Sequence, residues 1–230
     1  MVDVSVICPT YHRHMFLPIL IKQFKNQDYT SKMELIIFDD SEEPYPFEEI
    51  KNDSRIIYKH DNSKRFMLWE KRNILNDLCN GNIIVCMDDD DISFTNRITY
   101  SVEKLNENPK ALIAGNSSLY IYDLLQKQLY KFPSRIKTAI LNGTFAYKKQ
   151  LLKTNKYKRS KHNINEEKSF TQNYKTPYVL LDYDKTIVCV SHNSNTVEKS
   201  KFCTIVSDQN INIPSNMLKQ FYNINPIIYW

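Results

Sequence analysis

Glycine is scarce in this sequence. The 230 residues contain only 3 glycines, and none lies in Pro9-Thr10-Tyr11-His12-Arg13, which follows the first apolar run. A P-loop, or the glycine-rich loop that a nucleotidyltransferase places after its first strand, uses glycines so that backbone N–H groups can surround a phosphate. The sequence therefore argues against both kinds of phosphate-binding loop.

Paired cysteines and long apolar runs are also missing. The 5 cysteines form no Cys-x-x-Cys pair, and Cys8, Cys86 and Cys189 stand inside apolar runs, as buried thiols of a reducing compartment do. No run of about 18 apolar residues occurs, and Asp3 interrupts the first apolar run. We therefore expect no membrane span, no signal peptide and a cytoplasmic location.

Acidic residues are absent between Leu124 and Asn165, whereas Lys and Arg are frequent there, and the whole chain carries a net charge of +5. Such a stretch can attract an anionic partner: a nucleotide diphosphate, an acidic glycan or a nucleic acid. It can equally be a solvated face of a lysine-rich protein. No nucleic-acid recognition motif occurs, so we expect no nucleic-acid partner.

The first half of the chain alternates between amphipathic helices and short apolar strands. Helical spacing of apolar residues covers residues 15–26, 68–79 and 95–106, and apolar runs predict strands at 4–8, 34–38, 56–58 and 83–87. Pro9 is expected to end the first strand. Unbroken apolar strands alternating with helices predict an α/β protein with a mainly parallel sheet and helices on both faces.

After Pro109 the pattern becomes a mixture of short strands and helices. We expect strands at 111–114, 179–182 and 187–191, a hairpin over 119–132, an extended run over 138–147 and a short helix over 148–153. We expect one domain over residues 1–230, with a nucleotide-binding half (1–110), an acceptor-binding half (111–200) and a C-terminal tail (201–230).

Polar clusters follow three of the first strands: Thr10–His14, Asp39–Glu43 and Asp88–Asp91. Ligands of parallel α/β sheets bind outside the carboxyl ends of the strands, so the three clusters should meet at one edge.

The four consecutive aspartates Asp88–Asp91 are the strongest chemical signal in the sequence. If the strand continues in extended form, Asp88 and Asp90 point to the same side and repel each other unless a cation lies between them. Oxygen ligands suit Mg²⁺ or Mn²⁺. His192, which follows the apolar run 187–191, is a candidate further ligand, although a lone His is more often structural. An acidic turn is the alternative, with Asp91 as a helix cap, but it accounts for only one aspartate.

Several segments, taken together and in order, resemble glycosyltransferase family 2, whose fold is GT-A. In the first half these are VSVICPTYHR, LIIFDDS, EKRN and CMDDDD. In the second half, NGTFAYKKQLL resembles the family's acceptor-side segment, NEEKSF its "ED" base motif and VSHNSNT its C-terminal His segment. The resemblance covers roughly residues 2–197 and implies a Rossmann-like central sheet and an inverting nucleotide-sugar transferase.

The resemblance implies a donor site and a metal site. The nucleotide and donor residues would be Pro9, Thr10, Tyr11, Arg13, Asp39, Asp40, Lys71, Arg72, Asp88, Asp89 and Asp91. Within this set, Asp39 would bond the base, Asp88 the ribose, and Asp91 would lie near the sugar. Asp90 would bind Mn²⁺ or Mg²⁺ together with His192. From the residues alone, Arg72 could also be an ordinary exposed helix residue.

The resemblance places the catalytic base in the pair Glu166-Glu167. The family's base is the second residue of the motif, here Glu167, but Glu replaces the family's Asp at this position, so Glu166 stays open as the base. Two glutamates in a first helical turn are also favoured by the helix dipole alone.

The expected function is the inverting, metal-dependent transfer of a hexose from a UDP-sugar, of the UDP-glucose or UDP-galactose type, to a hydroxyl of a glycan or glycosylated protein. The alternative is a catalytically inactive module that binds a nucleotide-sugar or a metal. The sequence does not fix the oligomeric state.

Overall fold

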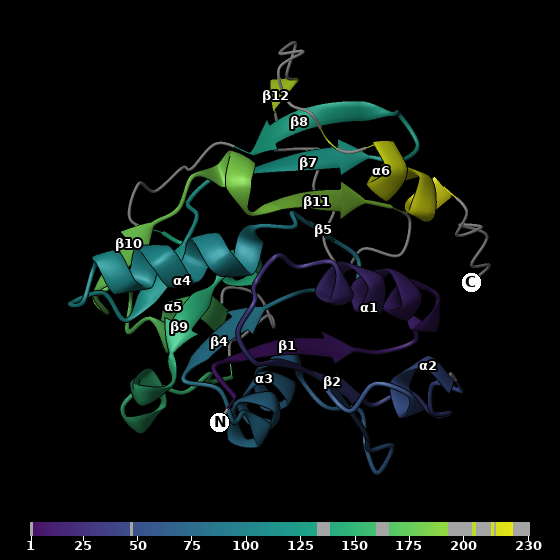
Figure 1. Cartoon of the computed structure of the whole chain (residues 1–230), viewed down its shortest axis with the longest axis horizontal. Helices are drawn as coiled ribbons and strands as arrows, with labels where there is room; N and C mark the ends of the chain where they lie inside the picture. Colours follow the sequence, from purple (N-terminus) through teal and green to yellow (C-terminus); the bar gives the residue numbers. More distant parts are fainter. Residues whose placement is uncertain are drawn as a thin grey trace.

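The computed structural model describes residues 2–46, 48–132, 139–159, 166–192, 204–205, 213 and 215–222. Within these residues the strands form two sheets (Figure 1). The larger sheet has the strand order β10-β6-β9-β4-β1-β2-β3, and the smaller one β12-β8-β7-β11-β5.

The larger sheet contains β1 (Val4–Thr10), β2 (Met33–Asp39), β3 (Ile56–His60), β4 (Ile83–Cys86), β6 (Ile113–Gly115), β9 (Ala146–Lys148) and β10 (Tyr178–Leu180). The smaller sheet contains β5 (Ile92–Ser93), β7 (Leu119–Asp123), β8 (Gln128–Phe132), β11 (Ile187–Ser191) and β12 (Thr204–Ile205). The α-helices are α1 (Leu17–Lys25), α2 (Glu48–Lys51), α3 (Leu68–Leu78), α4 (Arg97–Glu107), α5 (Glu166–Phe170) and α6 (Ser215–Tyr222). The short 3₁₀ helices are η1 (His14–Phe16), η2 (Asn142–Thr144), η3 (Lys149–Lys153) and η4 (Tyr183–Lys185).

Strands β3, β2, β1 and β4 lie side by side and are parallel. Successive side chains of a strand point to opposite faces, and β1 shows this clearly. Val4 and Val6 pack in one cluster with Leu20 of α1, whereas Ile7 packs in another with Leu75 of α3. The prediction of an α/β fold with a mainly parallel sheet and helices on both faces is confirmed, and α1 and α3 lie on opposite sides of β1 in Figure 1.

The first strand is longer than predicted, because Pro9 does not end it. Strand β1 continues to Thr10, with Pro9 opposite Phe38 of β2. On its other side, β1 pairs with β4 only as far as Ile7. Proline lacks an N–H group, and it is tolerated in a strand where that group has no ladder partner.

The sheets combine strands from both sides of residue 110. Strand β9 pairs antiparallel with β4 and β6 in the larger sheet, and β5 pairs with β11 in the smaller one. The hairpin over 119–132 is confirmed as β7 and β8.

No helix among the described residues is both long and apolar enough to cross a membrane.

The expected extended run over 138–147 is wrong in its described part, 139–147. Asn142–Thr144 form η2, and the strand begins only at Ala146. The hydroxyl of Thr144 donates to the carbonyl oxygen of Leu141 at 2.6 Å, and the amide of Asn116 donates to that hydroxyl at 2.8 Å. Short polar side chains that bond nearby backbone favour such turns over strands.

Candidate functional site

The polar clusters that follow β1, β2 and β4 meet at one edge of the larger sheet, as predicted. The hydroxyl of Thr10 donates to Oδ2 of Asp89 at 2.6 Å. Nε2 of His14 lies 2.8 Å from Oδ2 of Asp39. These contacts join residues that are far apart in the sequence, and they place the acidic run beside the ends of β1 and β2.

The acidic run is a turn and not an extended segment. Strand β4 ends at Cys86, and residues 89–90 form the turn. Asp88 and Asp90 therefore have different partners: Oδ1 of Asp88 lies 3.5 Å from Nη2 of Arg72, whereas Oδ2 of Asp90 lies 2.9 Å from Nη1 of Arg13. The expectation that the strand continues through these two carboxylates is wrong, because β4 stops before them, so strand alternation does not set their directions.

Asp89 is buried at the centre of the turn. Its Oδ1 accepts a hydrogen bond of 3.1 Å from Arg13. Burial, and after it the charge of Asp90, raise the pKa of the Asp89 carboxyl to about 7, although the contacts with Arg13 and Thr10 oppose the rise. Arg13 thus supplies one cation to the repelling carboxylates from within the protein itself.

Asp91 ties the acidic turn to the smaller sheet. Its Oδ1 accepts a hydrogen bond of 3.1 Å from the backbone N–H of Val190 in β11. The interpretation of Asp91 as a cap of the next helix is wrong, because α4 begins only at Arg97. The contact of Asp91 with β11 also brings His192, just beyond that strand, close to Asp90. Nε2 of His192 lies 3.2 Å from Oδ2 of Asp90.

His192 packs against Phe16, and Phe16 also lies beside α6, a helix that the sequence did not predict. The ring of Phe16 lies 4.8 Å from the ring of His192, and 6.2 Å from the ring of Phe221 in α6 (centroid distances). The hydroxyls of Tyr122 in β7 and Tyr222 in α6 are 2.5 Å apart. The apolar residues of α6 were the available signal, but helical spacing over so short a segment does not show what the helix covers.

Asp90 and His192 are the described residues best suited to hold a metal. Within the described part of the chain, no group of three or more His, Cys, Asp or Glu side chains is arranged around a common point. Two protein ligands are enough if oxygen atoms of the substrate or of water complete the octahedral coordination sphere of the ion. Ligands at about 2.1 Å in adjacent octahedral positions are about 3 Å apart, and the observed separation is 3.2 Å.

Asp39 is buried at the end of β2, and both its oxygens accept hydrogen bonds. Oδ1 accepts from the backbone of Ser41 at 2.9 Å, and Oδ2 accepts from the hydroxyl of Tyr58 at 2.6 Å. Burial raises the pKa of this carboxyl, but the hydrogen bonds lower it more, so the net shift is below the ordinary value. Asp39 is therefore held ionised and fixed.

Asp40 gathers two cations beside Tyr11. Its carboxylate pairs with Lys71, which is buried, and with Nη1 of Arg65 at 2.6 Å. Lys71 also donates to the backbone oxygen of Thr10 at 2.8 Å. The guanidinium carbon of Arg65 lies 3.4 Å from the ring centroid of Tyr11. Sequence reasoning missed Arg65, because it lies outside the recognised segments.

The glutamate pair lies in the first turn of α5. Glu166 is buried, and its Oε1 lies 3.4 Å from Nε of Arg72. Glu167 is half-buried. Burial raises the pKa of Glu167, the charge of Glu166 adds to the rise, and Arg72 opposes it. The structure thus joins Asp88 to the glutamate pair through Arg72.

A second arginine that sequence reasoning missed lies under the acidic turn. Arg97 is 1% exposed. It donates to the backbone oxygen of Gly143 at 2.6 Å, to that of Cys86, and to the hydroxyl of Ser93 at 2.7 Å. A Cβ at Gly143 would stand 2.9 Å from Oδ2 of Asp88, so a larger residue would push on that carboxylate.

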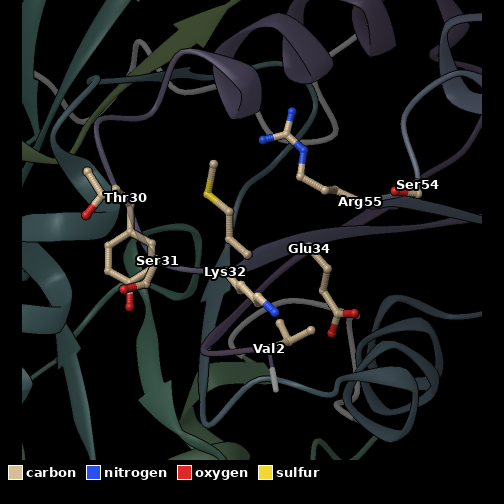
Figure 2. Close-up of a pocket in the computed structure, with 9 residues that line it drawn as sticks. Val2, Thr30, Ser31, Lys32, Glu34, Ser54 and Arg55 are labelled. Carbon is tan, nitrogen blue, oxygen red and sulfur yellow. The ribbon is translucent and has the colours of Figure 1, made fainter.

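A separate pocket lies at the edge of the larger sheet opposite to the polar clusters (Figure 2). It is lined by residues at the amino ends of β2 and β3, among them Lys32, Glu34 and Arg55. None of the predicted site residues lines it. Ligands of parallel sheets bind at the carboxyl ends, so we do not assign the donor to this pocket.

Comparisons with known proteins agree with the geometry. A protein of Campylobacter jejuni, described as GalNAc(5)-diNAcBac-PP-undecaprenol beta-1,3-glucosyltransferase, is 32% identical over 121 residues, which are 50% of this chain and 38% of that protein. The chain thus aligns with well under half of this relative's length.

Two solved structures share the fold. The crystal structure of S. aureus TarS 1-349 has a TM-score of 0.64 at 17% identity, over 82% of this chain and 60% of that chain. Mannosyltransferase PcManGT from Pyrobaculum calidifontis, in complex with GDP-Man and Mn²⁺, has a TM-score of 0.60 at 16% identity, over 87% and 58%. The fold is therefore GT-A, as expected. The sequence profile described as Glycosyl transferase family 2 matches residues 5–170. Because this match covers most of the chain, the protein belongs to glycosyltransferase family 2.

Proposed function

We propose that this chain transfers a hexose from a UDP-sugar, of the UDP-glucose or UDP-galactose type, to a hydroxyl of a glycan or glycosylated protein, with inversion at the anomeric carbon. The observation that carries the proposal is the chain of contacts Asp88–Arg72–Glu166. It joins the acidic turn to the glutamate pair, so that a donor at the turn would have a carboxylate base nearby.

The comparisons support this choice of substrates. The Campylobacter relative is described as a glucosyltransferase with a lipid-linked glycan in its name. TarS 1-349 has also been solved in complex with UDP-GlcNAc, with a TM-score of 0.61 to this chain. The UDP-GlcNAc complex supports a UDP-sugar donor, and the name of the Campylobacter relative supports a glycan acceptor. Residues 1–110 and 111–200 are the proposed donor and acceptor halves.

The donor would bind at the carboxyl edge of the larger sheet. Pro9, Thr10 and Tyr11 end β1 or follow it, and we propose that they line the uridine pocket with Asp39 and Asp40 behind them. Arg13 already contacts Asp89 and Asp90, and it is placed to donate to the diphosphate. Asp88 is the proposed ribose partner and Asp91 a residue near the sugar.

Asp90 and His192 would hold Mn²⁺ or Mg²⁺, as the spacing of 3.2 Å between Oδ2 and Nε2 allows. When bound there, the ion neutralises charge that grows on the departing diphosphate. PcManGT, one of the structural neighbours, was solved with Mn²⁺.

Glu167 is the proposed base. The acceptor oxygen forms a bond to the anomeric carbon, the bond from that carbon to the diphosphate oxygen breaks with its electron pair leaving on UDP, and Glu167 accepts the acceptor's proton. Two features favour Glu167 over Glu166: Glu166 is engaged by Arg72, and the pKa of Glu167 is raised. A base with a raised pKa removes a proton more readily once it is ionised.

One observation favours the alternative of an inactive binding module. Oδ2 of Asp90 is contacted by Arg13 at 2.9 Å, so a guanidinium stands where a metal would bind. A chain that keeps this contact with substrate present would bind nucleotide without turning it over.

A screen of UDP release tests the proposal. The protein is incubated with UDP-glucose, UDP-galactose, UDP-GlcNAc or GDP-mannose, with Mn²⁺ or with a chelator, and with a set of oligosaccharide acceptors. We expect nucleotide release from a UDP-hexose that depends on Mn²⁺. Mn²⁺-dependent UDP binding without any release would support the inactive module, and release from GDP-mannose alone would contradict the uridine assignment.

A further inference from the structure

Arg72 is a buried arginine in the middle of the site. It lies on α3, and only 4% of its side chain is exposed. The interpretation of Arg72 as an ordinary exposed helix residue is therefore wrong. Burying a guanidinium is costly unless it is paired and hydrogen-bonded, so its partners indicate what it does.

Two carboxylates from different elements flank the guanidinium. Nη2 lies 3.5 Å from Oδ1 of Asp88 in the acidic turn, and Nε lies 3.4 Å from Oε1 of Glu166 in α5. Burial lowers the pKa of Arg72, but Asp88 and Glu166 raise it more, so the charge is retained. One cation thus joins the donor-side turn to the element that carries the proposed base.

Asn142 covers a face of the guanidinium. With its amide oriented to donate to the hydroxyl of Tyr157 at 2.6 Å, its carbonyl oxygen lies 2.8 Å from Nε and Nη2 of Arg72 and 2.9 Å from Nη1, over the face of the guanidinium. The ring of Tyr157 in turn stacks on Phe170 at the end of α5, with 4.1 Å between centroids and 4° between planes. The donors of Arg72 are therefore directed at the protein and at α5.

We propose that Arg72 is a positioning residue that fixes α5, and with it Glu167, against the acidic turn, and that it does not bind the nucleotide. This rests on the proposed function. Arg72 holds Glu166 in place, and Glu166 is adjacent in sequence to Glu167, so the base carboxylate is set at a defined distance from a donor whose ribose is bound at Asp88.

The arrangement predicts two opposite electrostatic effects on Glu167. Glu166 raises the pKa of Glu167, and Arg72 lowers it. Removing the Arg72 charge should therefore shift the acidic limb of the pH profile of kcat to higher pH. Removing the Glu166 charge should shift the same limb to lower pH. A residue that only supports the fold would shift neither.

The test compares Arg72→Met, Arg72→Lys and Glu166→Gln with wild type. For Arg72→Met we expect kcat to fall by roughly 10–100-fold, the range known for residues that orient a metal ligand from the outer shell. The dissociation constant of UDP, measured by calorimetry, should stay within about twofold, because a residue that makes no nucleotide contact contributes little binding energy. Arg72→Lys should restore the position of the acidic limb, and Glu166→Gln should move it down. Arg55→Met, at the opposite edge of the sheet and paired with Asp53, is the control that should change nothing.

Two results would overturn the proposal. UDP binding weakened as strongly as kcat in Arg72→Met would make Arg72 a nucleotide contact, which is the role that the sequence predicted. Unshifted acidic limbs in both Arg72→Met and Glu166→Gln, with lower kcat, would reduce Arg72 to a structural residue. If Arg72→Met does not fold, the acidic limb of Glu166→Gln and the UDP affinity of Arg72→Lys still decide. Absence of turnover in the wild type would refute the proposed function, whereas the UDP calorimetry would still report on Arg72.

Discussion

Arg13 and Arg72 make a useful comparison, because each pairs with carboxylates of the same acidic turn in a different setting. Arg13 contacts Asp89 and Asp90 with 21% of its side chain exposed, whereas Arg72 contacts Asp88 with 4% exposed. A partly exposed guanidinium can exchange a carboxylate for an incoming diphosphate. A buried one cannot move without breaking its surroundings. Although the ion pairs are similar, we expect Arg13 to bind substrate at one end of the turn and Arg72 to support the protein framework at the other.

The largest effect is expected at the base. Glu167→Gln should lower kcat by about 10²–10⁴-fold, since a general base contributes that much, and UDP binding should stay near wild type. In the wild type, kcat should rise with pH through a pKa above that of an ordinary glutamate, because burial and Glu166 raise the pKa of Glu167. Initial rates against pH, with calorimetry for UDP, measure both.

Glu166→Gln is the matched variant for the base assignment, and it should retain much more activity than Glu167→Gln. The reverse order would assign the base to Glu166.

Asp90→Ala should lower Mn²⁺-dependent turnover by about 10²–10³-fold, as the loss of one transition-state stabiliser does. The structural reason is that His192 alone would remain of the proposed metal pair. Turnover measured across a Mn²⁺ titration tests this, with the exposed Asp77→Ala on α3 as control. Full activity in Asp90→Ala would remove the metal assignment.

Arg13→Met should weaken UDP binding roughly 10-fold, because one charge-assisted hydrogen bond to a diphosphate is lost. The same substitution at Arg72 should leave UDP binding nearly unchanged. Paired calorimetric titrations of the two variants sharpen the comparison directly. Equal losses in both would show that burial does not separate their roles.

The smallest effect is expected from Tyr157→Phe, which removes the hydroxyl that accepts from Asn142 and keeps the stacking on Phe170. We expect the free energy of unfolding to fall by about 1–3 kcal/mol, because a buried amide loses its partner, with at most a few-fold change in kcat. Urea unfolding and initial rates measure these quantities. A loss of turnover as large as that of Glu167→Gln would mean that Tyr157 takes part in the reaction.

Much of the donor side could be predicted from the sequence. The ends of parallel strands meet at one edge by construction, so the contacts of Thr10 with Asp89 and of His14 with Asp39 follow from locating the strands. The course of the acidic turn could not be predicted, because nothing local to Asp88–Asp91 shows that β4 stops at Cys86.

The contacts around the proposed base were harder to predict from the sequence, for a physical reason. Arg72 and Glu166 are 94 residues apart, and Asn142 and Tyr157 come from segments between them. Local periodicity reports which face of an element is apolar, but it does not report which distant polar groups share a buried cation. Arg97 was missed for a related reason, since two of its three partners are backbone oxygens.

The most direct test of the account is the anomeric configuration of the sugar at the first moment of release or transfer, measured by proton NMR with an α-linked UDP-hexose and Mn²⁺. A single displacement assisted by Glu167 predicts the β anomer first, before any mutarotation. The α anomer as the first product would contradict the proposed role of Glu167 and the arrangement built around it.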